Sequence, residues 1–403
     1  MGGFLEAEFN DLALALFALQ FAHVEPYRRF CEARRATPGK VTFWTEIPPV
    51  PAAAFKEFQL SSLPAAERTT VFHSSGTTTP QPSRHFHNAV SLALYEASLL
   101  PWFKAHLLPD VEPFAIPFII LTPPANLAPN SSLAHMFETV RRELGAADSL
   151  FTGRIDGTGA WALDADATLK TLRKSTETEQ PVALLGTAFS FVHLLDHLSA
   201  RSLRFRLPAG SRVMETGGYK GRSRSLPGAE LHALITRCLG IRPSQIVCEY
   251  GMSELSSQAY DCQVPAVEST AIELTQPCHA SDDPLDLTPN RHRSLPRDFE
   301  SKTKKLRGMP DSMTAAAGSG TGTAARLFRF PPWARACVIS AETGGEVAEG
   351  ETGLIQVWDL ANVRSIMALQ TEDLAVRRGD GFELVGRAAL AEPRGCSLRN
   401  TGS

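Results

Sequence analysis

The stretch VALLGTAFSFVHLLDHLS, residues 182–199, decides the fold of this chain. Its first four residues, Val182–Leu185, form an apolar run of the length expected for a buried strand. Gly186-Thr187 interrupts the run, and from Ala188 onward the apolar residues recur at helical spacing. The stretch therefore predicts a strand, a tight turn and a helix in direct succession.

The same succession recurs twice farther along the chain. Arg212–Glu215 predicts a strand that enters Thr216-Gly217-Gly218, and a helix is expected over residues 228–239. Gln245–Glu249 predicts another strand, which enters Tyr250-Gly251. Strands that alternate with helices indicate a layered α/β fold with a mainly parallel sheet.

Composition divides the chain into three regions. Residues 1–263 carry N-terminal helices and the alternating elements, and we expect them to form one α/β body. Residues 264–325 are rich in Pro, Ser, Thr, Gly and Ala, which predicts a disordered surface insertion. A basic patch that docks an acidic partner or RNA is the alternative for this insertion. Residues 326–403 hold strand-like segments between glycine-containing turns and predict a small β-rich C-terminal lobe.

Overall charge and cysteine content narrow the class of protein. The 403-residue chain is 43% hydrophobic with a formal net charge of −3, which gives no sign of a general affinity for nucleic acid or anionic membrane. No apolar run reaches the roughly 20 residues needed to span a bilayer. The seven cysteines are scattered and odd in number, so we expect a cytoplasmic protein without a disulfide framework.

A hydroxyl-rich loop, SSGTTTP at residues 74–80, is expected between a strand at Thr69–His73 and a helix at Asn88–Leu107. The backbone N–H and side-chain O–H groups of such a loop can surround phosphate oxygens, and Gly76 lets the backbone approach them. The loop is not the lysine-bearing GxxxxGK[ST] sequence, which disfavours a P-loop nucleoside triphosphatase. Taken alone, the loop fits a solvated turn equally well.

A second motif, CEYGMSE at residues 248–254, lies where a predicted strand ends. Tyr250 could stack on a purine, Ser253 could bond to a phosphate oxygen, and Glu254 could hold Mg²⁺. Taken singly, Tyr250 could also be a core tyrosine and Glu254 a solvated surface acid.

Two residues near the C-terminal end complete a predicted nucleotide site. Asp373, in TEDLAV, is a carboxylate that could accept both hydroxyls of a ribose. Arg387, which follows Gly386, could bring a fixed positive charge to a phosphate or ribose.

The order of these pieces resembles the adenylate-forming enzyme superfamily: a Ser/Thr/Gly phosphate loop, then YGxTE, then TxD, then GR. Longer segments look like the acyl-protein synthetase family: FHSSGTTTPQPSRHFHN at 72–88, METGGYKGRSRSLP at 214–227 and EYGMSELSSQAYD at 249–261. Its best-known members are the long-chain-fatty-acid–luciferin-component ligase subunits of bacterial bioluminescence reductases. The similarity runs from PYRRFCE (26–32) to Leu398, with the insertion as the main gap.

The resemblance implies a ligase with the large-domain fold of that superfamily. It implies ATP-dependent conversion of a carboxylic acid, here expected to be a fatty acid, to acyl-AMP with release of pyrophosphate. The acyl group then passes to a protein cysteine as a thioester. ATP and Mg²⁺ are the implied cofactors, and an acyl-accepting reductase or carrier protein is the implied partner. By position, the resemblance assigns phosphate contacts to Ser74, Ser75, Gly76, Thr77 and Thr78, and adenine contacts to Gly217, Gly218 and Tyr250. It assigns a further nucleotide contact to Gly251, the ribose to Asp373, catalytic contacts to Ser253 and Arg387, and Mg²⁺ to Glu254. It assigns the acyl pocket to Phe189, Phe191 and His193.

Cys396, in RGCS, matches the region where family members carry their acylated cysteine. A thiolate attacks an acyl-adenylate readily, and the flanking Arg394 and Arg399 could lower the pKa of the Cys396 thiol. An inert terminal cysteine is the alternative for Cys396, as a core histidine is for His193.

Three departures from the family pattern bear on activity. Thr79 stands where the phosphate loop usually has glycine, and a β-branched residue resists a positive φ. The lysine that often follows the loop is missing, with Arg84 or His85 as possible substitutes. The sequence ends 16 residues after Arg387, so the mobile C-terminal domain of larger adenylating enzymes is not expected.

Two other functions remain open at this point. The chain could be a carboxylate–CoA ligase, in which free CoA accepts the acyl group. It could also be a non-catalytic nucleotide-binding subunit of a multienzyme complex. Acid-dependent exchange between ATP and pyrophosphate separates the catalytic hypotheses from this last one.

Overall fold

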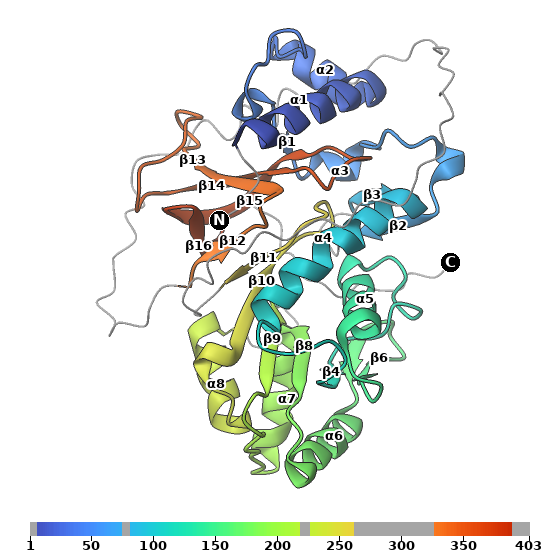
Figure 1. Cartoon of the computed structure of the whole chain (residues 1–403), viewed down its shortest axis with the longest axis vertical. Helices are drawn as coiled ribbons and strands as arrows, with labels where there is room; N and C mark the ends of the chain where they lie inside the picture. Colours follow the sequence, from blue (N-terminus) through green and yellow to red (C-terminus); the bar gives the residue numbers. More distant parts are fainter. Residues whose placement is uncertain (1–5, 75–80, 218–225, 262–325, 389–403) are drawn as a thin grey trace.

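One mixed sheet organises the molecule (Figure 1). The computed structural model describes residues 6–74, 81–217, 226–261 and 326–388. The expected α/β fold is confirmed. One half of the sheet is parallel, and the other half is antiparallel except for one short parallel pair at Val50–Pro51.

The parallel half contains the strands that the sequence predicts from its strand–turn–helix repeats. Their order is β10-β9-β8-β4-β5, and each neighbouring pair is parallel. Because all of them run in one direction, their carboxyl ends lie at one edge. The bounds are β4 (Phe118–Ile120), β5 (Leu150–Phe151), β8 (Ala183–Thr187), β9 (Arg212–Thr216) and β10 (Ile246–Tyr250).

Helices cover both faces of this half. Side chains alternate along each strand, so Phe118 and Ile120 pack in one hydrophobic cluster and Ile119 in another. The helix after β8 begins where Thr187 caps it, since the Thr187 hydroxyl accepts from the Ser190 N–H at 3.1 Å. Helices α4 (Ala89–Leu107) and α5 (Ser132–Leu144) cover the first face, and α6 (Ala165–Thr178), α7 (Ala188–Ala200) and α8 (Gly228–Leu239) cover the second.

The antiparallel half continues directly from β10. The strands predicted in the C-terminal region are present, and they extend the same sheet as the parallel strands. The insertion at 264–325 lies outside the described residues, but its flanks are paired, with Asp261 opposite Phe328. In sheet order the strands are β11 (Ala259–Asp261), β12 (Phe328–Arg329), β16 (Gly381–Arg387), β15 (Ala368–Arg378), β14 (Thr352–Asp359) and β13 (Ala334–Ile339), and β1 (Val50–Pro51) pairs with β15.

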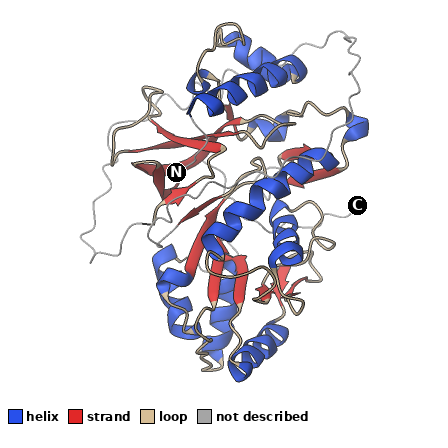
Figure 2. Cartoon of the chain, in the orientation of Figure 1, coloured by secondary structure: helices blue, strands red, loops and turns tan. Residues whose placement is uncertain are grey.

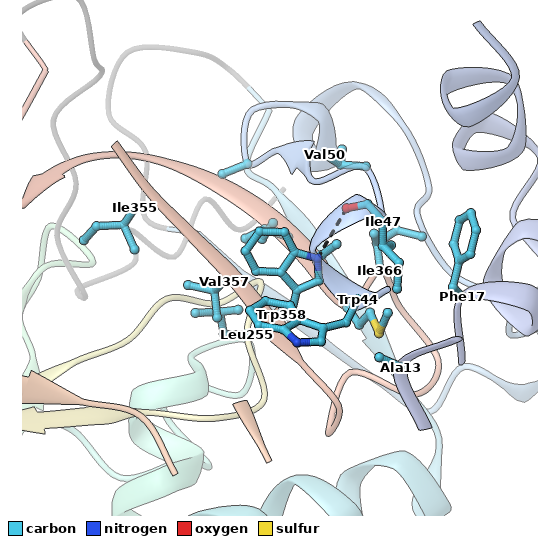
Figure 3. Close-up of a cluster of buried hydrophobic side chains, with 14 of the residues drawn as sticks. Ala13, Phe17, Trp44, Ile47, Val50, Leu255, Ile355, Val357, Trp358 and Ile366 are labelled. Atoms are coloured by element: carbon cyan, nitrogen blue, oxygen red, sulfur yellow. Dashed lines mark hydrogen bonds between the residues drawn. The ribbon is translucent and has the colours of Figure 1, made fainter. Parts of the chain in front are cut away.

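The N-terminal helices α1 (Glu6–His23) and α2 (Glu25–Ala33) pack against the antiparallel half, apart from the helices around the parallel strands (Figure 2). Trp44 and Trp358 meet edge to face at 5.0 Å between ring centroids, and the Trp358 indole N–H donates to the Ile47 carbonyl at 3.3 Å (Figure 3). Two short helices join this region, η1 (Trp44–Glu46) and α3 (Ala54–Glu57).

The context predicted for the hydroxyl-rich loop is wrong in one respect. Strand β2 (Thr70–His73) precedes the loop as expected, but a second strand, β3 (Arg84–His87), separates it from α4. In β3 the alternate residues His85 and His87 point inward and are buried. Their polar character hides the strand pattern in the sequence, since buried alternation is normally apolar.

The remaining elements are short. A hairpin of β6 (Gly153–Ile155) and β7 (Trp161–Leu163) lies beyond β4, and the 3₁₀ helices η2 (Ala65–Glu67) and η3 (Pro243–Gln245) connect larger elements. Among the described helices, none combines the length and apolar character that a membrane crossing requires.

Candidate functional site

The candidate site lies at the carboxyl edge of the parallel strands, where ligands of open α/β sheets bind. β9 ends at Thr216 and leads to Gly217, and β10 ends at Tyr250. Gly217 is exposed, and a side chain placed on it would meet nothing within 4 Å. Open space therefore lies beside Gly217, as a residue that contacts a base requires.

Tyr250 and Asp373 meet at this edge. The Tyr250 hydroxyl donates to Asp373 Oδ2 at 2.9 Å, and Arg387 Nε lies 3.3 Å from Asp373 Oδ1. Asp373 and Arg387 are direct partners across the β15–β16 pair, and Arg387 also binds Glu372. Three residues that the sequence predicts for one nucleotide site are thus brought together.

Aromatic rings enclose Tyr250. Its ring makes edge contacts with Phe328, Phe330 and Phe382 at centroid distances of 5.5–6.2 Å. Because 8% of Tyr250 is exposed, its ring presents little free surface to a purine in this conformation. The hydroxyl contact with Asp373 is the clearer role of Tyr250 in this structure.

Ser253 connects its motif with the β2–β3 hairpin. Its hydroxyl donates to the His73 carbonyl at 3.0 Å, and its own carbonyl accepts from His85 Nδ1 at 2.9 Å. Burial lowers the pKa of His85 to about 4, so the imidazole is neutral and its Nδ1 carries the donated hydrogen. Ser74 opens the loop of the hairpin, and its hydroxyl accepts from the Ser83 N–H at 3.0 Å. The described start of the hydroxyl-rich loop, at Ser74, therefore lies beside the second motif.

Asp359 holds the turn that follows Tyr250 through hydrogen bonds. The Asp359 carboxylate accepts from the N–H groups of Ser256 and Ser257 at 2.8 Å each and from the Ser257 hydroxyl at 2.7 Å. Asn362 donates to the Glu254 carbonyl at 2.8 Å. Burial raises the pKa of Asp359. The hydrogen bonds it accepts oppose this rise, and the bond from the Ser257 hydroxyl has the largest opposing effect.

Glu249 is an unusual carboxylic acid on β10. Burial raises its pKa to about 7, against the opposing effect of a hydrogen bond with Thr216. A Cβ added to Gly251 would come within 2.2 Å of Glu249 Oε1, so a larger residue there would displace the end of the Glu249 side chain. The Gly251 position predicted for the nucleotide thus also leaves room for the Glu249 carboxyl group.

A buried polar network lies on the α8 side of β9 and β10. His232 Nε2 and Glu215 Oε1 are 3.0 Å apart, and Arg326 donates to His232 Nδ1 at 2.8 Å. Arg326 also binds Asp261, whose pKa burial raises and Arg326 lowers. The network joins both flanks of the insertion to the strand that carries the nucleotide motif.

A cavity of 540 Å³ lies beyond the carboxyl ends of β4 and β8. Phe189 and His193 line it, with ring centroids 4.3 Å apart. Phe191 does not line this cavity, because it points to the opposite side of α7 and is fully buried in the hydrophobic core. Trp161 and His197 line the cavity as well.

Several predicted site residues cannot be placed. The phosphate loop beyond Ser74, the second adenine glycine and the cysteine predicted to be acylated lie outside the described residues, together with the departure at Thr79: Ser75, Gly76, Thr77, Thr78, Thr79, Gly218 and Cys396.

Sequence reasoning missed three contributors to the site. The sequence suggests His85 only as a substitute for lysine. In the structure His85 is buried and bonds to the Ser253 carbonyl, and its alternation with the buried His87 on β3 is the sequence signal for this position. Asp359 lies in an apolar strand end, WDLAN, where a lone carboxylate signals a buried acceptor. No sequence pattern indicates that Trp161 lines the cavity, because its position depends on a short hairpin.

Glu254 can offer a magnesium ion one carboxylate ligand. In the part of the chain that the structure describes, no cluster of three or more metal-ligating side chains exists. Mg²⁺ in nucleotide sites typically uses one or two carboxylates and takes its other ligands from phosphates and water. Glu254, which is 3% exposed, can supply such a single carboxylate.

The fold is similar to that of adenylate-forming CoA ligases. An open conformation of 2-hydroxyisobutyryl-CoA ligase, in complex with 2-HIB-AMP and CoA, has a TM-score of 0.59 and 11% identity over 95% of this chain and 69% of that one. The same ligase in its thioesterification state has a TM-score of 0.59 and 13% identity, over 94% and 68% of the two chains. ATP-bound MatB from Rhodopseudomonas palustris is more distant, with a TM-score of 0.45 and 14% identity over 81% and 49%. At these identities the likeness shows the fold alone.

Sequence comparison gives the family. No curated protein matches the chain. The family model described as "Acyl-protein synthetase, LuxE" matches residues 6–267, nearly two thirds of the 403 residues. The chain therefore belongs to the LuxE acyl-protein synthetase family and is structurally related to acyl-adenylate-forming ligases.

Proposed function

We propose that this chain uses ATP to convert a carboxylic acid, for which the family suggests a fatty acid, to acyl-AMP and then transfers the acyl group to a cysteine thiol. The contact that carries this proposal is the double link from Ser253 to His73 and His85. It sets the YGMSE motif directly against the hairpin that begins the phosphate loop. In the proposed complex the phosphate donors of the loop and the nucleotide contacts would then converge on one place, as adenylation requires.

In the first step a carboxylate oxygen of the acid attacks the α-phosphorus of ATP. The bond from the α-phosphorus to the oxygen bridging to the β-phosphate breaks, and pyrophosphate leaves with the electron pair. Negative charge grows on the α-phosphate oxygens during this step. The Ser253 hydroxyl can turn from the His73 carbonyl to such an oxygen, and Arg387 supplies a fixed positive charge nearby.

Asp373 is suited to bind the ribose. Its carboxylate accepts from the Tyr250 hydroxyl through Oδ2 and forms an ion pair with Arg387 through Oδ1. In the proposed complex the two ribose hydroxyls would donate to the same carboxylate, which offers about four lone-pair sites. The open space beside Gly217 would receive the base.

Glu254 would hold Mg²⁺ together with the triphosphate. When bound, the ion would neutralise charge on the departing pyrophosphate. Asn362 donates to the Glu254 carbonyl and so fixes the backbone position from which the Glu254 carboxylate extends.

The second step is proposed for Cys396. Its thiolate would attack the acyl carbon, the bond from that carbon to the AMP oxygen would break, and AMP would leave. Burial raises the pKa of Cys31 and of Cys337 to about 12, so these thiols are poor competitors. The thiol must stay reduced, which fits a cytoplasmic enzyme. A reductase or carrier protein would then accept the acyl group.

The test is exchange of radiolabelled pyrophosphate into ATP with a broad panel of carboxylic acids. We expect acid-dependent exchange in the wild type, a loss of at least a hundredfold in Glu254→Gln, and unchanged exchange in the Cys396→Ser variant. Protein-bound, hydroxylamine-labile acyl label should disappear in Cys396→Ser and persist in the control variant Cys337→Ser. If no acid supports exchange while ATP still binds, the chain is a non-catalytic subunit. If label appears only on added CoA, it is a CoA ligase.

A further inference from the structure

The guanidinium of Arg387 is shared between two carboxyl groups of β15. Its Nη2 donates to Glu372 Oε2, and its Nε forms an ion pair with Asp373 Oδ1 at 3.3 Å. Glu372 also binds the backbone beside Arg387, because its carbonyl accepts from the Ala388 N–H at 3.0 Å. Glu372 therefore holds both the side chain of Arg387 and the end of the strand that carries it.

An irregularity in the β15–β16 pair lies next to this cluster. The register shifts by one residue between Leu374 and Ala375, beside the Asp373–Arg387 pair. Gly386 has a φ of 149°, a conformation that residues with a side chain rarely adopt. Such a bulge re-aims the side chains beside it, and here one guanidinium reaches two carboxyl groups that are adjacent in sequence.

Arg387 and a ribose would compete for the Asp373 carboxylate. The Tyr250 hydroxyl already donates to Asp373 Oδ2 at 2.9 Å, and in the proposed complex two ribose hydroxyls would donate to the same group. A guanidinium that turns fully to a carboxylate makes two parallel hydrogen bonds, which would use two of its roughly four lone-pair sites. A donor of Arg387 that Glu372 engages is withdrawn from this competition.

We propose that Glu372 is a positioning residue, which draws the Arg387 guanidinium toward itself and so keeps the Asp373 carboxylate open to ribose hydroxyls. The inference rests on the proposed function, because it concerns the nucleotide that is to be bound. Glu372 is 34% exposed, and an ion pair at such a position contributes little to stability by itself. A merely structural role would therefore leave the recognition of the ribose unchanged.

The test compares ATP with 2′-deoxy-ATP and 3′-deoxy-ATP in acid-dependent pyrophosphate exchange. Each analogue lacks one donor to Asp373, so the wild type should prefer ATP over at least one of them, by roughly tenfold in kcat/KM. In Glu372→Ala the guanidinium can turn to Asp373. The kcat/KM for ATP should then fall roughly tenfold and that for this analogue less than about threefold, so the preference shrinks.

Two further variants make the result specific. Glu372→Gln keeps an acceptor oxygen for Arg387 and should retain the preference in part, and it decides the question if Glu372→Ala does not fold. The matched control is Glu383→Ala, which removes a carboxyl group paired with Arg378 across the same two strands at 3.4 Å. The control should leave the preference for ATP intact.

Calorimetric titration with the three nucleotides and Mg²⁺, without acid, makes the inference independent of turnover. It should show the same loss of preference in Glu372→Ala. A preference that survives unchanged in both Glu372 variants would overturn the inference, as would equal losses for ATP and both analogues, or a wild type that does not distinguish the three nucleotides. Absence of exchange with every acid, beside the expected shift in nucleotide binding, would overturn the proposed function alone.

Discussion

The hydroxyl of Tyr250 donates to the Asp373 carboxylate at 2.9 Å, although the two residues are 123 positions apart in the chain. The contact joins β10, at the edge of the parallel half of the sheet, to β15 in the antiparallel half. The proposed nucleotide site is therefore built across the seam between the two halves.

Tyr250→Phe tests this contact. Removal of a hydrogen bond to a carboxylate should lower the free energy of unfolding by about 1.5–3 kcal/mol and raise KM for ATP roughly tenfold. Urea unfolding and steady-state exchange measure the two effects. The matched control is Tyr260→Phe, because the Tyr260 hydroxyl is buried without a partner in the described chain and its loss should cost little. Equal effects of the two substitutions would contradict the assignment.

The buried histidines of β3 predict that the stability of the folded chain is sensitive to acid. Burial lowers the pKa of His85 to about 4 and that of His87 to about 2, so neither binds a proton in the folded chain at pH 5. In the unfolded chain both titrate near pH 6.5. Their stabilising contribution is present above pH 6.5 and is lost as pH falls, down to about pH 4 for His85 and about pH 2 for His87, with a slope of about 1.4 kcal/mol per pH unit for each histidine. His87→Phe should flatten the stability–pH curve, whereas His23→Gln should not.

Arg326→Met should destabilise the chain strongly. It leaves Asp261, which is 1% exposed, without its cation, and breaking a buried ion pair from one side costs about 3–5 kcal/mol. Denaturant unfolding measures the change. Arg329→Met removes an exposed pair with Asp380, which should cost under about 1 kcal/mol. A small effect at position 326 would show that the network does not hold the flanks of the insertion.

Asp359→Ala should weaken the proposed nucleotide site, although Asp359 itself lies outside that site. Ser256 and Ser257 would lose their common acceptor, and the turn that carries Glu254 would loosen. We expect a rise in KM for ATP of at least tenfold and a loss of about 2–4 kcal/mol in the free energy of unfolding. Asp359→Asn keeps one acceptor oxygen and should fall between Asp359→Ala and wild type, while Asp380→Asn serves as an exposed control. Unchanged KM in a folded Asp359→Ala variant would remove Asp359 from a positioning role.

Replacement of residues 264–325 by a four-residue Gly/Asn/Ser linker should leave the fold intact. Asp261 and Phe328 are already antiparallel partners, which places their Cα atoms about 5 Å apart, and Arg326 is retained to bind Asp261. Circular dichroism and the unfolding midpoint are the readouts. A cooperative transition within a few degrees of wild type supports the domain boundaries expected from composition, and a molten chain contradicts them.

Long periodic segments of this sequence predict their structure well. The stretch from Val182 to Ser199 yields β8 and α7 almost residue for residue, because an apolar run, a capping threonine and helical spacing agree there. The order of the Tyr250, Asp373 and Arg387 motifs likewise predicts that they belong to one site, and the structure brings them together.

Features that depend on tertiary burial escape such prediction. Strand β3 is hidden because its inward residues are histidines, and their burial can be known only once α4 and α5 cover them. Phe191 and Phe189 have the same residue type two positions apart, yet only their angular position on α7 decides which lines the cavity. Asp359 acts through backbone donors that no side-chain motif records.

The pairing of β1 with β15 bears on how the chain folds. Val50 lies opposite Leu369, and Gln20 donates to the Asn362 carbonyl, so one segment binds another that is synthesised 342 residues later. Contacts of such high sequence separation slow folding and leave apolar surface uncovered meanwhile. The nascent α1 and α2 therefore lack these contacts until the strands that bury Phe17 and Trp44 have been synthesised. Any truncation that removes β15 should remove the proposed ribose carboxylate, Asp373. It should also leave α1 and α2 without part of the surface against which they pack.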